Sequence, residues 1–351
     1  MYALSRAAVA ALSALSLVGC ATPLTQPLKR EVATAAQPVE VKVGIRQPEL
    51  YGAFEVSRAG QAAAAGCGAI PGIGILLAAA CGAAAGAMDA TINASRAKAA
   101  DETIRPLKDE IVDLKFDQAM SSAIAKALTN VPGMSFSGVV VTKETTDAKY
   151  EETYKASTAG GVMFVNVDYH LSIDLSTLQM SARALLYPRS PAARAAAGLP
   201  GDLNAPAAPN QATAMLDPKN AAYRSMVVYR AKLPLQGKEP AEHLAAWKAD
   251  NGRLLRTSLN DGMAQLGRLL VEDIQRGPDA PALPSLGKVE GDNRLQADLV
   301  AESHGGKLLR YPTGALYFQT TLGGTAAATA QAPAAGGTAP AAPAANTATA
   351  R

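Results

Sequence analysis

Two adjacent stretches of alternating apolar residues constrain the fold of this chain most. From Phe164 to Asp174 every second side chain is apolar, and polar side chains mostly fill the positions between them. A turn at Asp174 to Ser176 leads into a second alternating stretch that ends at Leu186. Such alternation is typical of half-buried strands, and a short turn between two of them predicts an antiparallel hairpin. The first apolar face is expected to consist of Val165, Val167, Tyr169, Leu171 and Ile173.

Helical patterns flank this hairpin. Residues 101–114 and 117–128 carry apolar residues at helical spacing, and Asp117 is expected to cap the second helix, which buries Met120, Ile124 and Leu128. A longer apolar stripe comes later and ends at Gly277-Pro278; it consists of Leu255, Leu259, Met263, Leu266, Leu270 and Ile274.

Further strands are predicted at 39–43, 139–144 and 223–233. A last hairpin is predicted at 307–321, with Pro312 to Gly314 as its turn. Strands in runs with helices on either side predict an α+β fold, with a mainly antiparallel sheet of about four to six strands.

A long uncharged segment precedes this pattern. Between Arg58 and Asp89 lie 30 residues without a charge, mostly Ala and Gly. The length alone would suit a membrane span, but the few strongly apolar residues contribute only about −0.3 to −0.6 kcal/mol each, and Pro71 interrupts the run. A membrane helix is therefore marginal. A helix pair packed on the domain or mobile, membrane insertion, and self-association all stay open.

Small residues recur at four-residue spacing in this segment, at Gly68 and Gly72 and again at Gly82 and Gly86. Such spacing lets two helices approach closely. The segment resembles the glycine-zipper segments of some bacterial outer-membrane lipoproteins, and this resemblance covers less than about a tenth of the chain. It makes the four glycines candidate helix-packing residues.

The N-terminus carries a second family resemblance. Arg6 precedes an apolar run from Ala7 to Val18, which is typical of a secretory signal and too short to span a bilayer. The motif Leu17-Val18-Gly19-Cys20 resembles the lipobox of bacterial lipoproteins, in which the cysteine is lipidated and becomes the first mature residue. An ordinary cleaved signal and an uncleaved anchor are the alternatives. Charge, apolar length and motif together favour lipidation of Cys20.

The residue after Cys20 is Ala21 rather than aspartate. The resemblance then implies the outer membrane, with the domain facing the periplasm. The expected organisation is a signal peptide (1–19), a tether with a possible first strand (20–58), a helical segment (59–98), a periplasmic α+β domain with a loop at 187–220 (99–322) and a disordered Ala/Pro/Thr-rich tail (323–351).

The remaining cysteines, Cys67 and Cys81, form an even pair in an oxidising compartment. On one straight helix their Cα atoms would lie about 21 Å apart, whereas a disulfide needs about 4.4–6.8 Å. A helical hairpin that turns at Pro71 to Gly74 would bring them together. We therefore predict a Cys67–Cys81 disulfide.

No catalytic signature is found. Asp168, His170 and Ser172 share one strand face, but neighbours two apart are separated by about 6.6 Å along the backbone, so a solvated face without mutual hydrogen bonds is expected. No metal-ligand cluster or cofactor motif is evident, and no metal, cofactor or catalytic residue is predicted. Trp247 is expected to be a core or capping contact.

The formal net charge of +3 does not argue for a nucleic-acid partner. The sequence predicts a non-catalytic outer-membrane lipoprotein that acts by protein interaction in envelope assembly, transport or maintenance, attached to the membrane by its N-terminal lipid. A subunit of an oligomeric export or channel assembly, and thus a homo-oligomer, is one alternative. An envelope hydrolase whose site is assembled from distant residues is the other.

Overall fold

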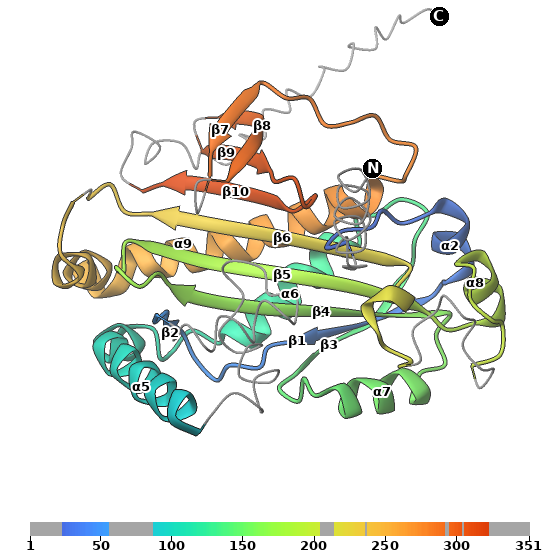
Figure 1. Ribbon diagram of the computed structural model, residues 1–351, viewed down its shortest axis with the longest axis horizontal. Helices are drawn as coiled ribbons and strands as arrows, with labels where there is room; N and C mark the ends of the chain where they lie inside the picture. Colours follow the sequence, from blue (N-terminus) through green and yellow to red (C-terminus); the bar gives the residue numbers. More distant parts are fainter. Residues whose placement is uncertain are drawn as a thin grey trace, which may run out of the picture.

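One mixed ten-stranded sheet organises the chain (Figure 1). The structure is a computed structural model that describes residues 23–55, 87–203, 214–235, 237–291, 295–303 and 305–322. The strand order is β3-β1-β4-β5-β6-β10-β9-β8-β7, and β2 pairs with β4 beside β1. The strands are β1 (Val39–Gly44), β2 (Tyr51–Gly52), β3 (Phe136–Thr142), β4 (Gly161–Leu171), β5 (Thr177–Pro188), β6 (Tyr223–Lys232), β7 (Gly287–Glu290), β8 (Gln296–Ser303), β9 (Gly306–Arg310) and β10 (Leu316–Thr321).

The helices of the described residues are of very different lengths. The longest, α9, is two helices joined at a non-helical stretch from Ala249 to Gly252. The helices are α2 (Arg30–Ala35), α5 (Ala87–Glu110), α6 (Phe116–Leu128), α7 (Asp147–Ala156), α8 (Pro191–Ala196), the 3₁₀ turn η1 (Pro218–Asn220) and α9 (Pro240–Gln275).

The α+β class is confirmed, but the predicted sheet was too small and too simple. β1 runs parallel to β3 and to β4, β2 runs parallel to β4, and β10 runs parallel to β6. The remaining ladders are antiparallel. Parallel neighbours must be joined by long crossovers that leave no turn signal in the sequence. Local patterns therefore predicted the hairpins and missed the parallel pairs.

The central hairpin is confirmed. β4 and β5 pair antiparallel from Gly161–Pro188 to Leu171–Leu178, and the predicted face of β4 lies in the main core. Ile173 is the exception: it lies beyond the end of β4 and is 56 % exposed. The chain has already turned there, because the Asp174 carboxylate accepts hydrogen bonds from the Ser176 backbone amide and the Ser176 hydroxyl.

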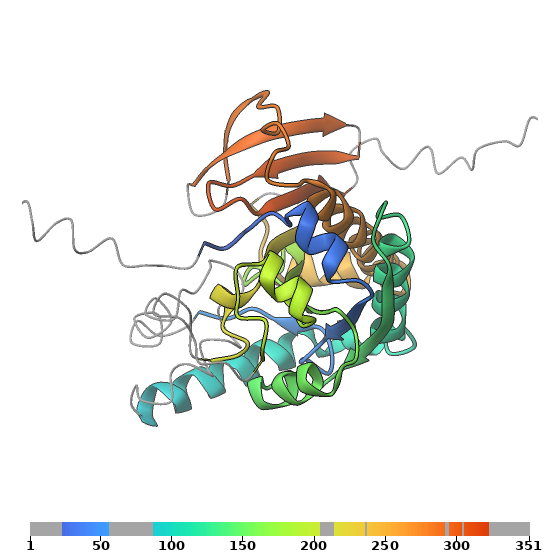
Figure 2. The ribbon, with the colours of Figure 1, turned by 90° about the vertical axis from the view of Figure 1, so that its right-hand side faces the viewer.

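Two helices cover one face of the sheet. Figure 1 draws α6 and α9 behind β4, β5 and β6, and the turned view of Figure 2 places both helices on the same side of the sheet. The predicted stripes of both helices are buried in the main core. The expected cap is wrong by two residues: Lys115 is the N-cap of α6, and Asp117 lies in the first turn.

β1 confirms the strand expected at 39–43, and it is an interior strand of the sheet, next to the edge strand β3. It lies between β3 and β4, and Val39, Val41 and Val43 are fully buried. The folded unit therefore includes residues that precede position 99.

The stretch 187–220, expected to be a loop, contains the end of β5, α8 and η1. The last hairpin is confirmed as β9 and β10, and Gly314 in its turn has a φ of +87°.

Several expected sites lie outside the described residues. They are the lipidation site Cys20, the cysteines Cys67 and Cys81, and the zipper glycines Gly68, Gly72, Gly82 and Gly86. The tail beyond residue 322 also lies outside them. Within the described part of the chain, no helix is long and apolar enough to cross a membrane.

Candidate functional site

The sheet face opposite α6 and α9 carries polar side chains between two apolar clusters. One cluster forms where α7 packs on β4 and β5, and it includes Tyr154, Phe164 and Tyr187. The other forms where β9 and β10 adjoin β6, and it includes Val228 and Tyr317. Alternation along each strand separates these side chains from the main core behind the sheet.

One row of polar side chains crosses this face. The strand registers pair Tyr51 with His170, His170 with Gln179, and Gln179 with Arg230, and Arg230 pairs in turn with Gln319 of β10. We call these five residues the polar row. His170, Gln179 and Arg230 are each less than a tenth exposed, which is unusual for such side chains and requires hydrogen-bond partners.

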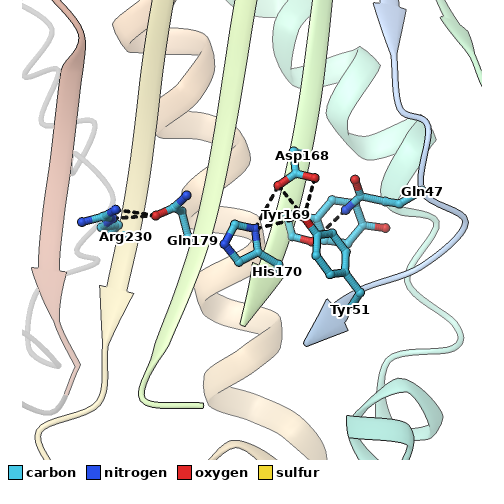
Figure 3. Close-up of polar contacts among 7 residues, drawn as sticks. All are labelled: Gln47, Tyr51, Asp168, Tyr169, His170, Gln179 and Arg230. Carbon is cyan, nitrogen blue, oxygen red and sulfur yellow. Dashed lines mark hydrogen bonds and ion pairs between the residues drawn. The ribbon is translucent and has the colours of Figure 1, made fainter. Parts of the chain in front are cut away.

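Asp168 organises one end of the polar row (Figure 3). Its Oδ2 lies 2.9 Å from His170 Nδ1, and the Tyr51 hydroxyl donates to Oδ1 at 2.8 Å and to Oδ2 at 3.0 Å. The Tyr51 ring stacks on the imidazole with ring centroids 5.3 Å apart. Burial raises the pKa of Tyr51, and the charge of Asp168 raises it further, so the phenol stays neutral and donates.

The expected solvated face without mutual hydrogen bonds is wrong for Asp168 and His170. Both side chains are largely buried and contact each other directly. The backbone separation did not exclude this contact, because two side chains on one face can lean along the strand and close a gap that their Cα atoms leave open. Ser172 is different. It lies beyond β4, and its hydroxyl donates to Asp174 in the hairpin turn.

Arg230 and Gln179 form the other end of the row. The guanidinium of Arg230 donates to Gln179 Oε1 through Nε at 2.8 Å and through Nη2 at 2.6 Å, as Figure 3 shows. Its charge also lies 5.0 Å from the centre of the Tyr317 ring, a distance suited to a cation–π contact. Burial lowers the pKa of Arg230, but a guanidinium remains charged.

The loop after β1 supports this site from the side. Gln47 donates through Nε2 to the Tyr169 carbonyl oxygen at 2.7 Å, next to His170 in the chain. Lys143 donates to the Gln47 carbonyl oxygen and forms an ion pair of 2.7 Å with Asp117. These contacts fix the edge of β4 on which Asp168 and His170 lie.

A carboxylate that orients a histidine is half of a nucleophilic catalytic site. The other half is a nucleophile within about 2.6–3.2 Å of the second ring nitrogen. His170 Nε2 lies on the side of the ring that faces β5 (Figure 3), and within the described part of the chain it makes no hydrogen bond. The described residues also contain no group of three His, Cys, Asp or Glu side chains able to hold a metal ion. The second ring nitrogen of an imidazole held in this way can form a hydrogen bond with a ligand.

Two further arginines lie on the same face. Arg183 pairs with Asn166 and with Met226, and Arg224 pairs with Leu185. Sequence analysis missed these arginines, the polar row beyond His170, and the role of Tyr51. Charged residues at the outward positions of two otherwise apolar strands were the available signal.

Other residues singled out in the sequence are structural. Trp247 is fully buried and donates to the Leu175 carbonyl oxygen, which confirms it as a core contact. His243 is structural too: its two ring nitrogens face the carbonyl oxygens of Asp174 and Leu235.

Comparison with known proteins adds no name to this site. No protein-family model matches the chain, and a search of curated proteins finds no significant match.

Proposed function

We propose that this chain is a lipid-anchored protein of the bacterial envelope that acts by binding rather than by catalysis. Its partner is another envelope protein, in assembly, transport or maintenance. The polar row, with Asp168 behind it, is the observation that supports a binding role. Buried polar groups in fixed geometry discriminate between ligands, because a ligand that fails to match them leaves them unpaired.

The proposed location depends on the proposed lipid attachment at Cys20. The proposed outer-membrane position follows from the resemblance of Leu17 to Cys20 to a lipobox and from Ala21 after it. Two or more acyl chains would hold the protein at the membrane, so the domain would not need a helical anchor. Replacing Cys20 with serine removes the thiol that accepts the lipid. Fatty-acid labelling is expected in the wild-type protein and absent in Cys20→Ser, and equal labelling of both would contradict the anchor.

Cross-linking in cells tests the binding role. We expect a cross-linked complex that forms with the full-length wild-type chain and is lost when His170→Ala removes the imidazole of the polar row. Lys126→Ala is the matched control, because Lys126 is exposed on α6 on the other side of the sheet. Circular dichroism of both variants checks that they are folded. A complex unaffected by His170→Ala would contradict recognition by this face.

The contact between Asp168 and His170 favours an envelope hydrolase as a second candidate. An oriented histidine is a general base when a nucleophile or a water reaches its free nitrogen. A panel of ester, amide and glycoside substrates with the purified chain separates the two candidates. Turnover that disappears in His170→Ala would establish the enzyme, whereas binding without turnover supports the first proposal.

A further inference from the structure

Arg183 and Arg224 lie next to each other on the polar face of the sheet. Arg183 is opposite Met226, and Arg224 lies two residues before Met226 in β6, so the two arginines are diagonal neighbours on one face. Diagonal cross-strand neighbours lie about 7–8 Å apart, within reach of two long side chains. We call these residues the arginine pair.

No acidic side chain of the described residues forms an ion pair with the arginine pair. Among the described residues neither arginine forms an ion pair, and the Nε atoms of both are buried without a hydrogen bond. Arg224 is 5 % exposed, and its Nη1 donates only to the Pro218 carbonyl oxygen, at 2.7 Å. The charge of Asp217 acts on Arg224 and raises its pKa, but the Asp217 carboxylate accepts from the Lys219 backbone amide and forms no ion pair with either arginine within the described residues. The nearest carboxylate along β4, that of Asp168, is already bonded to Tyr51 and His170.

The rest of the chain offers few acidic groups for this role. Of the side chains that the structure leaves undescribed, only those of Asp89 and Asp292 are acidic. The long undescribed stretches 56–86 and 204–213 contain no aspartate or glutamate at all. A counter-charge for the pair is therefore better supplied by another molecule than by this chain.

Burial makes the pair costly in the absence of an anion. Burial lowers the pKa of Arg183 and the pKa of Arg224, and the charge of Arg183 lowers the pKa of Arg224 further. Two guanidinium groups on one half-covered face repel each other and lose hydration, and a bound anion would relieve both effects. A pair kept in this state is typical of a binding site rather than of a stabilising contact.

Neighbouring groups extend the site. Asn166 lies opposite Arg183; its Oδ1 accepts from the Tyr150 hydroxyl, and its Nδ2 makes no hydrogen bond within the described residues. An amide donor beside two guanidinium forks matches the planar, multiply accepting oxygens of a phosphate or a carboxylate.

We propose that Arg183 and Arg224 bind an oxyanion group, phosphate or carboxylate, beside the polar row. The inference goes beyond the proposed protein partner, because it adds a second ligand of stated chemical class to the same face. The polar row remains the part of the face that the protein partner contacts. The oxyanion can belong to a small soluble molecule or to a lipid headgroup, which share this chemistry.

Calorimetric titration of the full chain in a non-ionic detergent tests the proposal. The probes are inorganic phosphate, pyrophosphate and citrate, and, for a lipid source, dihexanoyl-phosphatidylglycerol against dihexanoyl-phosphatidylcholine. We expect saturable binding of at least one anionic probe. Binding of the anionic lipid alone would assign the oxyanion to a headgroup, and binding of the soluble anions would assign it to a small molecule.

Matched variants connect the binding to the arginine pair. Arg183→Gln is expected to weaken binding at least tenfold, whereas Arg253→Gln, at an exposed arginine paired with Asp250, is expected to leave it unchanged. Arg183→Lys keeps the charge but loses the fork, and it is expected to bind several-fold more weakly than wild type. The thermal midpoint of Arg183→Gln without ligand should equal or exceed that of wild type, because an unpaired buried charge is removed.

Two results would overturn the proposal. One is the absence of saturable binding for every anionic probe, and the other is equal affinity in wild type and Arg183→Gln. Either result leaves the proposed function separately testable, since the cross-linked complex that depends on His170 does not require an anion at Arg183.

Discussion

Trp247 and Leu175 are joined by a hydrogen bond of 2.7 Å from the indole Nε1 to the Leu175 carbonyl oxygen. This bond connects the first half of α9 to the turn between β4 and β5, 72 residues away in the chain. Leu175 has a φ of +58° and is 4 % exposed, so the turn holds a leucine in the left-handed region. The indole thus stabilises a turn conformation that is sterically unfavourable for a leucine.

Trp247→Phe tests this connection. The phenyl ring keeps most of the apolar contact but leaves the Leu175 carbonyl oxygen without its donor and a small cavity beside it. We expect a loss of about 2 kcal/mol in the free energy of unfolding, measured by denaturant titration. Val112→Ala, at a residue that is 84 % exposed, is the control and should change stability little. A Trp247→Phe protein as stable as wild type would contradict the role of the bond.

His243 should make stability depend on pH. Burial alone would lower its pKa, but hydrogen bonds to the carbonyl oxygens of Leu235 and Asp174 and the charge of Asp174 raise it above 6.5. A raised folded-state pKa means that protonation favours the fold. The contribution is therefore complete below about pH 6.5 and is lost as the pH rises through the folded-state value.

The measurement compares urea unfolding of wild type and His243→Gln between about pH 5 and 9. Wild type should lose stability relative to the variant as the pH rises across this range. Parallel stability curves for the two proteins would show that His243 does not titrate between the folded and unfolded states.

Asn251 occupies a left-handed position in the interruption of α9, with a φ of +55°. Glycine adopts this conformation without the steric cost of a side chain, so Asn251→Gly is expected to stabilise the protein by about 0.5–1 kcal/mol. Ser121→Gly in the middle of α6 is the matched control. The same residue at ordinary helical dihedral angles should lower stability by about 0.5–1 kcal/mol. Thermal melts of both variants give the comparison, and a destabilised Asn251→Gly protein would argue against a left-handed Asn251.

The position of β1 predicts which fragment folds. A fragment of residues 99–322 lacks β1, and β3 and β4 then lose the strand that joins them. We expect no cooperative thermal transition for this fragment and a cooperative one for residues 23–322. A cooperative melt of the shorter fragment would show that the sheet closes without Val39 to Gly44.

Cys67 and Cys81 remain a prediction from the sequence alone. Intact-mass analysis after alkylation without reduction should find neither cysteine labelled if they form a disulfide. Reduction before alkylation is the control and should add two labels. Two labels without reduction would defeat the helical hairpin and favour an extended segment.

Sequence patterns predicted the parts of this fold that are locally determined. These parts are the hairpin of β4 and β5, the hairpin of β9 and β10, and the buried stripes of α6 and α9. In each of them the apolar residues recur every few positions, so a short window of sequence contains the whole pattern and, for a hairpin, its turn. β2, β7 and α7 were missed, because they are short or polar and owe their form to their neighbours in space. The parallel ladders of β1 and β10 are long-range contacts, which no local pattern encodes.

The site was harder to predict than the fold. Asp168 and His170 were identified as sharing a face, but their burial depends on segments far away in the chain, and so does the contact with Tyr51. The arginine pair needed the register of β5 against β6, because only the register places Arg183 beside Arg224. Each of the five strands contributes one residue to the polar row, so the sequence of any single strand shows no pattern that predicts the row.

The pairing of β1 with β3 and β4 also imposes an order of events on the newly made chain. Val39 pairs with Phe136 and with Gly161, so on the order of 100 residues must follow β1 before its first ladder can close. Until then Val39, Val41 and Val43 are exposed on a strand with two open edges, which is a segment prone to aggregation. β1 is therefore among the first strands to be synthesised, yet it must wait for β3 and β4 before it can pair. How long β1 must be protected from aggregation is therefore set by the topology of the sheet rather than by the stability of the finished fold.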